Sequence, residues 1–266
     1  MGEGQVIEKT KLLNTKESLV RDFQRIGIKK GMIVIVHSSL SSIGWVCGGA
    51  VAVIQALMDI VTGDGTIIMP AHSGDYSDPT SWGNPPVPKE WIEIIKDTMP
   101  AFNEEITPTR GMGIIAETFR KFPNVLRSSH PTLSFCAWGN NSEQIIENHS
   151  LDYSLGEESP LARIYDLNGY VLLLGVGHSN NTSFHLSENR MINKKYVKAG
   201  APIIKDGIRV WEKYDDIEIN SDVFDELGKD FEKNYNVSIN NIGLAESRLF
   251  SQREAVDFGQ AWLDKR

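Results

Sequence analysis

His185 and Glu188 are the pair whose residue types and spacing most directly suggest chemistry. They belong to residues 180–188, which follow the apolar run Tyr170–Leu174 and a short turn. If a helix begins within this stretch, side chains three positions apart project from the same side and can share a ligand. The order strand, turn, helix places the imidazole and the carboxylate just past a buried strand. Open α/β sheets hold their active sites at that position.

Two other predicted strands also end in polar loops that carry a histidine. His37 follows the β-branched run 32–36, and His72 follows the run 66–69. In a parallel sheet, the loops at the carboxyl ends of neighbouring strands converge on one crevice. The three loops together predict a cleft containing His37, His72 and His185.

His185 could act as a general base, because an imidazole titrates near neutrality and can accept a proton from an attacking group. Glu188, Glu117 or Asp166 could then hold its tautomer. The alternative is a histidine at a helix start that bonds solvent or backbone. A metal site is not expected, because His178, His185 and Glu188 lack the spacing of an H-E-x-x-H motif.

The loop that begins at His37 could bind an anion, because its hydroxyl and N–H groups precede Gly48 and Gly49, which open the next helix. A serine-rich turn without a ligand is the alternative. The sequence contains neither the phosphate-loop spacing nor the dinucleotide fingerprint. It also lacks the G-x-S-x-G elbow of serine nucleophiles.

Other acidic and aromatic side chains are candidates for contacts to a substrate. Asp75, Tyr76 and Asp215 would suit a cationic substrate, although most surface carboxylates simply contact water. Glu117 lies off the apolar stripe of its predicted helix, so the default interpretation is a solvated surface glutamate.

Composition limits the function classes. The formal net charge of −8 argues against a general nucleic-acid binder and suits a small cationic partner. Two cysteines are too few for a disulfide framework, which indicates a cytoplasmic setting. No apolar run reaches membrane-spanning length. Either a monomer or a homodimer is compatible with the sequence.

The predicted elements alternate between helix and strand. A helix capped by Thr15 ends at Gly27, and a second helix after Gly49 separates the strands 32–36 and 66–69. This alternation predicts an α/β fold with a central, mostly parallel sheet flanked by helices. No linker divides the chain, so residues 1–266 are expected to form a single domain. Further elements are predicted by periodicity: helices at 89–98, 112–122, 142–148, 224–231 and after Ser251, strands at 133–137 and 207–211, and loops at 79–88 and 152–160.

Five segments in this order resemble the aminoglycoside 3-N-acetyltransferase family and cover the chain from about Gly31 to Trp262. They are residues 37–44 with Gly48 and Gly49, residues 107–113 with Glu117, residues 127–131, residues 156–161 and residues 181–188. The resemblance implies the α/β fold of this family, distinct from the acetyltransferases related to histone-modifying enzymes. It also implies acetyl-CoA as cosubstrate, no metal, and a role in antibiotic resistance.

The resemblance further implies which residues act. His185 matches the catalytic histidine, Glu117 a carboxylate associated with that site and the preferred orienting group, and Glu188 a contact to the substrate ammonium. Asp75, Tyr76 and Asp215 are the other expected substrate contacts. The cosubstrate would contact two segments, comprising His37, Ser38, Ser39, Leu40, Ser41, Gly44, Thr109, Arg110, Gly111 and Met112.

The expected reaction is direct acetyl transfer from acetyl-CoA to the 3-amino group of the deoxystreptamine ring, within a ternary complex and with His185 as base. No enzyme nucleophile is needed, in keeping with the missing elbow motif. Acetylation of another small amine is one alternative. A non-catalytic relative that binds CoA is the other.

Overall fold

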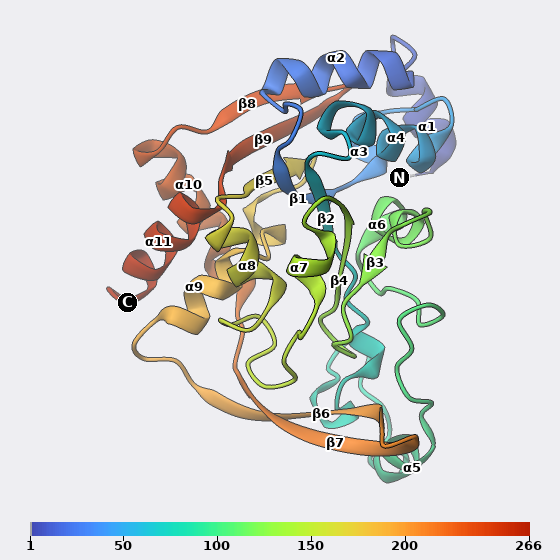
Figure 1. The fold of residues 1–266 in the computed structure, drawn as a ribbon, viewed down its shortest axis with the longest axis vertical. Coiled ribbons are helices and arrows are strands. Elements are labelled where there is room, and N and C mark those ends of the chain that lie inside the picture. Colours follow the sequence, from blue (N-terminus) through green and yellow to red (C-terminus); the bar gives the residue numbers. More distant parts are fainter. Residues whose placement is uncertain (1) are drawn as a thin grey trace.

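The computed structural model of the protein describes residues 2–266, in which seven strands form a central sheet in the order β3–β4–β2–β1–β5–β9–β8 (Figure 1). The strands are β1 (Ile33–Ser38), β2 (Thr66–Pro70), β3 (Leu126–Arg127), β4 (Phe135–Gly139), β5 (Tyr170–Leu174), β8 (Ser238–Ile242) and β9 (Ala245–Ser251).

The centre of this sheet is parallel. β1 pairs in parallel with β2 on one side and with β5 on the other. β4 and β9 pair antiparallel with β2 and β5, and β3 and β8 pair antiparallel with β4 and β9 in turn. Hence β3, β2, β1, β5 and β8 run in one direction, and β4 and β9 run in the other. The α/β fold with a mostly parallel sheet is confirmed, with one reversed strand on each side.

Both faces of the central strands are buried. Val34 and Val36 of β1 pack on one face, whereas Ile35 packs on the other. β5 alternates in the same way, with Leu172 on the first face and Leu173 on the second. Continuous apolar runs are what a strand covered on both sides requires.

Helices cover the two faces. The first face carries α2 (Lys16–Ile26), α4 (Gly49–Val61) and α6 (Gly113–Phe119). The second carries α7 (Ser142–Ile146), α8 (Pro160–Asp166), α9 (Phe184–Arg190), α10 (Phe224–Asn234) and α11 (Gln252–Leu263). Two short helices, α1 (Glu3–Lys9) and α3 (Leu40–Ile43), lie beside α4 in the blue part of the chain (Figure 1).

The predicted helix boundaries are mostly close to those observed. Thr15 caps α2 by accepting a hydrogen bond from the Ser18 N–H at 3.3 Å, and Gly27 ends it in the left-handed region. α8 was not predicted. Ser159 caps it and Pro160 occupies its first turn, a start signal that lies within a stretch expected to be a loop.

A second, two-stranded sheet extends away from the central one. β6 (Tyr196–Lys205) and β7 (Ile208–Ile217) form a long hairpin whose far end lies beside α5 (Ile92–Thr98) (Figure 1). The Phe102 N–H donates to the Pro202 carbonyl at 3.0 Å, and Arg209 Nε donates to the Met99 carbonyl at 3.0 Å. The hairpin therefore holds the segment that follows α5. The sequence predicted only part of β7 and did not predict β6. Gly200 and Pro202 weaken the strand pattern of β6.

Candidate active site

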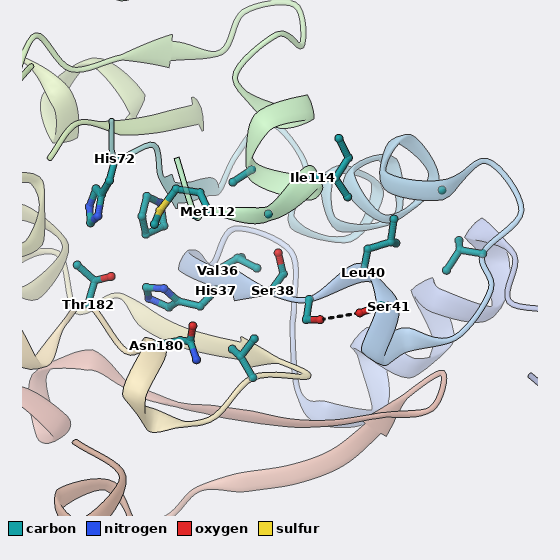
Figure 2. A pocket seen from close by; sticks show the side chains of 18 of the residues that line it. Val36, His37, Ser38, Leu40, Ser41, His72, Met112, Ile114, Asn180 and Thr182 are labelled. Atoms are coloured by element: carbon teal, nitrogen blue, oxygen red, sulfur yellow. Dashed lines mark hydrogen bonds between the residues drawn. The ribbon is translucent and has the colours of Figure 1, made fainter. Parts of the chain in front are cut away.

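A cavity of about 1020 Å³ opens at the carboxyl ends of β1 and β2 and beside the start of α9. Figure 2 shows His37, His72 and Thr182 at one end of this cavity and Leu40, Ser41 and Ile114 toward the other. His185 also lines it, so all three predicted loops contribute a histidine. The convergence expected from a parallel sheet is confirmed.

His185 lies in the first turn of α9 and is held by the carboxylate one turn later. Its Nδ1 lies 2.6 Å from Glu188 Oε2, and the second carboxylate oxygen accepts the Asn220 N–H at 2.8 Å. The Glu188 side chain is only 5% exposed, and the His185 ring packs against Phe224 with centroids 4.9 Å apart. Because Nδ1 faces the carboxylate, Nε2 is the ring nitrogen left for a substrate.

This geometry corrects two expectations. Glu188 was expected to contact the substrate ammonium, but both of its oxygens are engaged inside the protein. Glu117 was the preferred partner of His185, but the contact belongs to Glu188. The third candidate, Asp166, is exposed at the end of α8. A helix spacing of three residues permits the His185–Glu188 contact, and packing against the Asn220 backbone selects it.

Glu117 instead forms hydrogen bonds and ion pairs with residues close to it in the chain. Its carboxylate accepts from the Thr109 N–H and hydroxyl, from Arg120 Nε and Nη2, and from Lys121 Nζ. Burial alone would raise the pKa of Glu117, but the hydrogen bonds from Arg120, Lys121 and Thr109 outweigh burial and hold it well below its usual range. Glu117 therefore remains an ionised carboxylate that Arg120 and Lys121 neutralise.

His37 and His72 form a neutral part of the cavity wall. Burial, with a smaller contribution from the nearby His185, lowers the pKa of each to about 3. Neither Nε2 atom has a hydrogen-bond partner among residues 2–266. These two rings are therefore uncharged at neutral pH.

The predicted cosubstrate residues fall into two groups. His37, Ser38, Ser39, Leu40, Ser41, Gly44, Gly111 and Met112 line the cavity. Thr109 and Arg110 do not: Thr109 bonds Glu117, and Arg110 bonds Asp75 at 2.5 Å. The prediction therefore located both segments, but within residues 109–112 it did not distinguish the residues that line the cavity from those that do not.

The residues predicted to contact the cationic substrate do not line the cavity. Asp75 is exposed and paired with Arg110, Tyr76 packs edge-on against Phe102, and Asp215 lies on β7 and pairs with Lys198 at 2.6 Å. Their role as contacts to a cationic substrate stays a prediction.

Other wall residues were missed. Trp45, Ile114, Asn180 and Thr182 line the cavity. Ile114 lies within the helix predicted at 112–122 and is 55% exposed at the cavity. Asn180 and Thr182 belong to the stretch around His185, and their polarity between an apolar strand and a helix was the available signal.

His178 is separate from the site. Its Nε2 lies 2.8 Å from Glu232 Oε1 on α10, so it cannot join His185 and Glu188 around an ion. Across residues 2–266, no group of three histidine, cysteine or acidic side chains is arranged to hold a metal. In the same residues, no helix has both the length and the apolar character needed to cross a membrane.

Sequence comparisons identify the class of protein. A family model described as aminoglycoside 3-N-acetyltransferase matches residues 35–264. The SPbeta prophage-derived aminoglycoside N(3')-acetyltransferase-like protein YokD of Bacillus subtilis (strain 168) is 52% identical over 260 residues, which cover 97% of this chain and 96% of the relative. Aminoglycoside N(3)-acetyltransferase III of Pseudomonas aeruginosa is 32% identical over 268 residues, which cover 95% of this chain and 94% of the relative.

Solved structures of similar proteins have the same fold as this chain. The crystal structure of YokD superposes with a TM-score of 0.98 at 50% identity, covering 99% of this chain and 98% of the other. AAC-IIIb in a binary complex with CoASH gives a TM-score of 0.85 at 28% identity, covering 96% and 98%. AAC-VIa bound to sisomicin gives 0.87 at 28% identity, covering 96% and 99%.

The fold, the cavity and these relatives define the protein as an acetyltransferase. More narrowly, the chain belongs to the aminoglycoside 3-N-acetyltransferase family, as the motif series indicated.

Proposed function

We propose that the protein transfers an acetyl group from acetyl-CoA to the 3-amino group of the deoxystreptamine ring of an aminoglycoside, by direct attack in a ternary complex. The observation that carries the mechanism is the His185–Glu188 pair at the wall of the 1020 Å³ cavity. The names of the relatives support the substrate, and the CoASH and sisomicin complexes of AAC-IIIb and AAC-VIa support the two partners.

The cavity suits acetyl-CoA as cosubstrate. Helix α4 is thirteen residues long, and Gly48 at its cap offers no side-chain hydrogen bond to the first N–H groups. Gly48 and Gly49 both line the cavity. The Gly49 N–H donates to the Val46 carbonyl at 3.0 Å, so the N–H groups that follow it in the first turn and the positive end of the helix dipole favour a phosphate there. Leu40, Trp45 and Ile114 add apolar wall for the pantetheine chain.

His185 moves the proton. Its Nδ1–H donates to Glu188, so the Nε2 lone pair can accept a proton from the acceptor amine as the nitrogen attacks the thioester carbonyl. The C–N bond forms, the C–S bond breaks, and the proton held on Nε2 can pass to the departing CoA sulfur. The Glu188 carboxylate stabilises the imidazolium in between, as the buried acid of a catalytic triad does.

Measuring CoA release from acetyl-CoA across a panel of deoxystreptamine aminoglycosides and simple amines tests the function. His185→Ala should lower turnover roughly 10²- to 10⁴-fold, the usual contribution of a general base. CoA affinity, measured by calorimetry, should change less than about twofold, because His185 acts on the amine.

His178→Gln is the matched control, because His178 bonds Glu232 away from the cavity and should retain turnover. A fully active His185→Ala enzyme would refute the mechanism. Release with simple amines but with no aminoglycoside would indicate a different substrate. CoA binding without any release would indicate the non-catalytic alternative.

A further inference from the structure

The segment 109–113, which we call the 109–113 wall, lines the cavity through its last three residues and has no regular structure before α6 begins at Gly113. Gly111, Met112 and Gly113 line the cavity, and both glycines have positive φ, 74° and 79°. A Cβ at Gly113 would lie 3.6 Å from the Ser38 carbonyl oxygen, so the segment passes close to the carboxyl end of β1. Glycines give the chain freedom at this position, so other contacts must hold the wall in place.

Glu117 supplies those contacts at the upstream end of the wall. Its Oε2 accepts the Thr109 N–H at 3.0 Å and the Thr109 hydroxyl at 2.9 Å. The same carboxylate receives Arg120 in a bidentate pair at 2.7 and 2.9 Å, and Lys121 at 2.9 Å. We call Glu117, Thr109, Arg120 and Lys121 the Glu117 clamp. It joins the start of the wall to the helix that follows the wall.

Hydrogen bonds also join the Glu117 clamp to two neighbouring loops. Arg120 Nη1 donates to the Glu105 carbonyl at 2.7 Å, and the Arg120 side chain is only 5% exposed. The residue after Thr109 donates its N–H to the His72 carbonyl at 2.8 Å. The wall is thus tied to α6, to the loop before it and to the loop that carries His72.

The clamp also explains how a carboxylate can matter to this site without touching the base. His185 is bonded to Glu188, and every hydrogen bond to the Glu117 carboxylate within residues 2–266 comes from Thr109, Arg120 or Lys121. Charge-assisted and bidentate bonds are stronger and more directional than neutral ones, so they set the position of Thr109 closely.

We propose that Glu117 is a positioning residue for the cosubstrate: through Thr109 it holds the 109–113 wall in the conformation that binds acetyl-CoA, and it takes no part in proton transfer. The ligand is the one named by the proposed function, on which this inference rests. Removal of the clamp should then weaken cosubstrate binding and leave the chemistry intact once the cosubstrate is bound.

Glu117→Gln tests this. Glutamine keeps one acceptor for Thr109 but presents an amide to Arg120 and Lys121. We expect the Kd for CoA by calorimetry and the KM for acetyl-CoA to rise about 10-fold. The kcat at saturating acetyl-CoA should stay within about threefold of wild type, and the pH profile of kcat should be unchanged.

Thr109→Val is a milder second variant, since it removes the hydroxyl donor alone and keeps the shape of the side chain. It should raise the KM for acetyl-CoA about threefold and should not add to the effect of Glu117→Gln, because both break the same link. Glu143→Gln, on the exposed first turn of α7, is the control and should change neither constant.

A lowered kcat with unchanged KM, or a shifted pH profile, in Glu117→Gln would overturn the inference, because Glu117 would then act on the proton transfer. Unchanged CoA affinity in both variants would also overturn it. The result is separable from the proposed function: wild-type protein that binds CoA but acetylates no aminoglycoside refutes that function, while the loss of CoA affinity in Glu117→Gln still supports the clamp.

Discussion

Replacing Glu188 by glutamine should slow the chemical step strongly. The carboxylate accepts at both oxygens, from His185 Nδ1 at 2.6 Å and from the Asn220 N–H at 2.8 Å. Glutamine has a single acceptor oxygen. If it turns that oxygen to His185, its amide faces the Asn220 N–H, donor against donor. If it turns the oxygen to Asn220, its amide donates to Nδ1 and places the imidazole proton on Nε2, where the lone pair is needed.

The magnitude follows from the type of bond lost. A hydrogen bond to a charged group contributes about 1.5–3 kcal/mol, and the site is only 5% exposed on the Glu188 side, so solvent screens it little. At 1.36 kcal/mol per factor of ten, kcat should fall about 10- to 160-fold. If the wrong tautomer predominates, the loss can approach 10⁴-fold, as in serine proteases with the corresponding change.

The assay is CoA release at saturating acetyl-CoA and aminoglycoside, with CoA affinity measured in parallel. CoA affinity should be unchanged, because Glu188 lies behind His185 and does not line the cavity. Glu143→Gln is the control for a surface glutamate. A Glu188→Gln enzyme with kcat within twofold of wild type would show that Glu188 does not support the base.

Two further predictions concern stability. Burial lowers the pKa of five histidines from the ordinary value of 6.5: to about 3 in His37 and His72, to about 4 in His149, and also downward in His130 and His178. Below pH 6.5 the unfolded chain therefore binds more protons than the folded protein. The contribution of these neutral histidines to the free energy of unfolding is fully present above pH 6.5 and is lost as the pH falls toward 4, at roughly 1.4 kcal/mol per histidine for each pH unit. A free energy of unfolding, measured with urea, that stays constant across this range would contradict the prediction. Gly228→Ala should destabilise the protein by about 1–3 kcal/mol, because the methyl group would collide with the buried His178 ring, whereas Gly63→Ala, with nothing within 4 Å of its Cβ, should change the urea midpoint little.

Local pattern predicted most of the elements that carry the site. The runs that became β1 and β5 are continuous and apolar, which is sufficient to indicate strands buried on both faces. The hairpin β6–β7 and the edge strand β8 were missed in whole or part, because their residues are mixed in polarity and their partners are other strands rather than a core.

The sequence by itself determined that His37, His72 and His185 would meet, because parallel strands bring their carboxyl ends to one edge. It also placed Glu188 within reach of His185, through helix spacing. Only the tertiary structure decided which carboxylate contacts the base, since both Glu117 and Glu188 were compatible with the sequence. Asn220, distant in the chain, fixes Glu188 beside His185, and Arg120 and Lys121 hold Glu117 against Thr109. Spacing limits which side chains can meet, and the donors packed around each carboxylate determine which of them do.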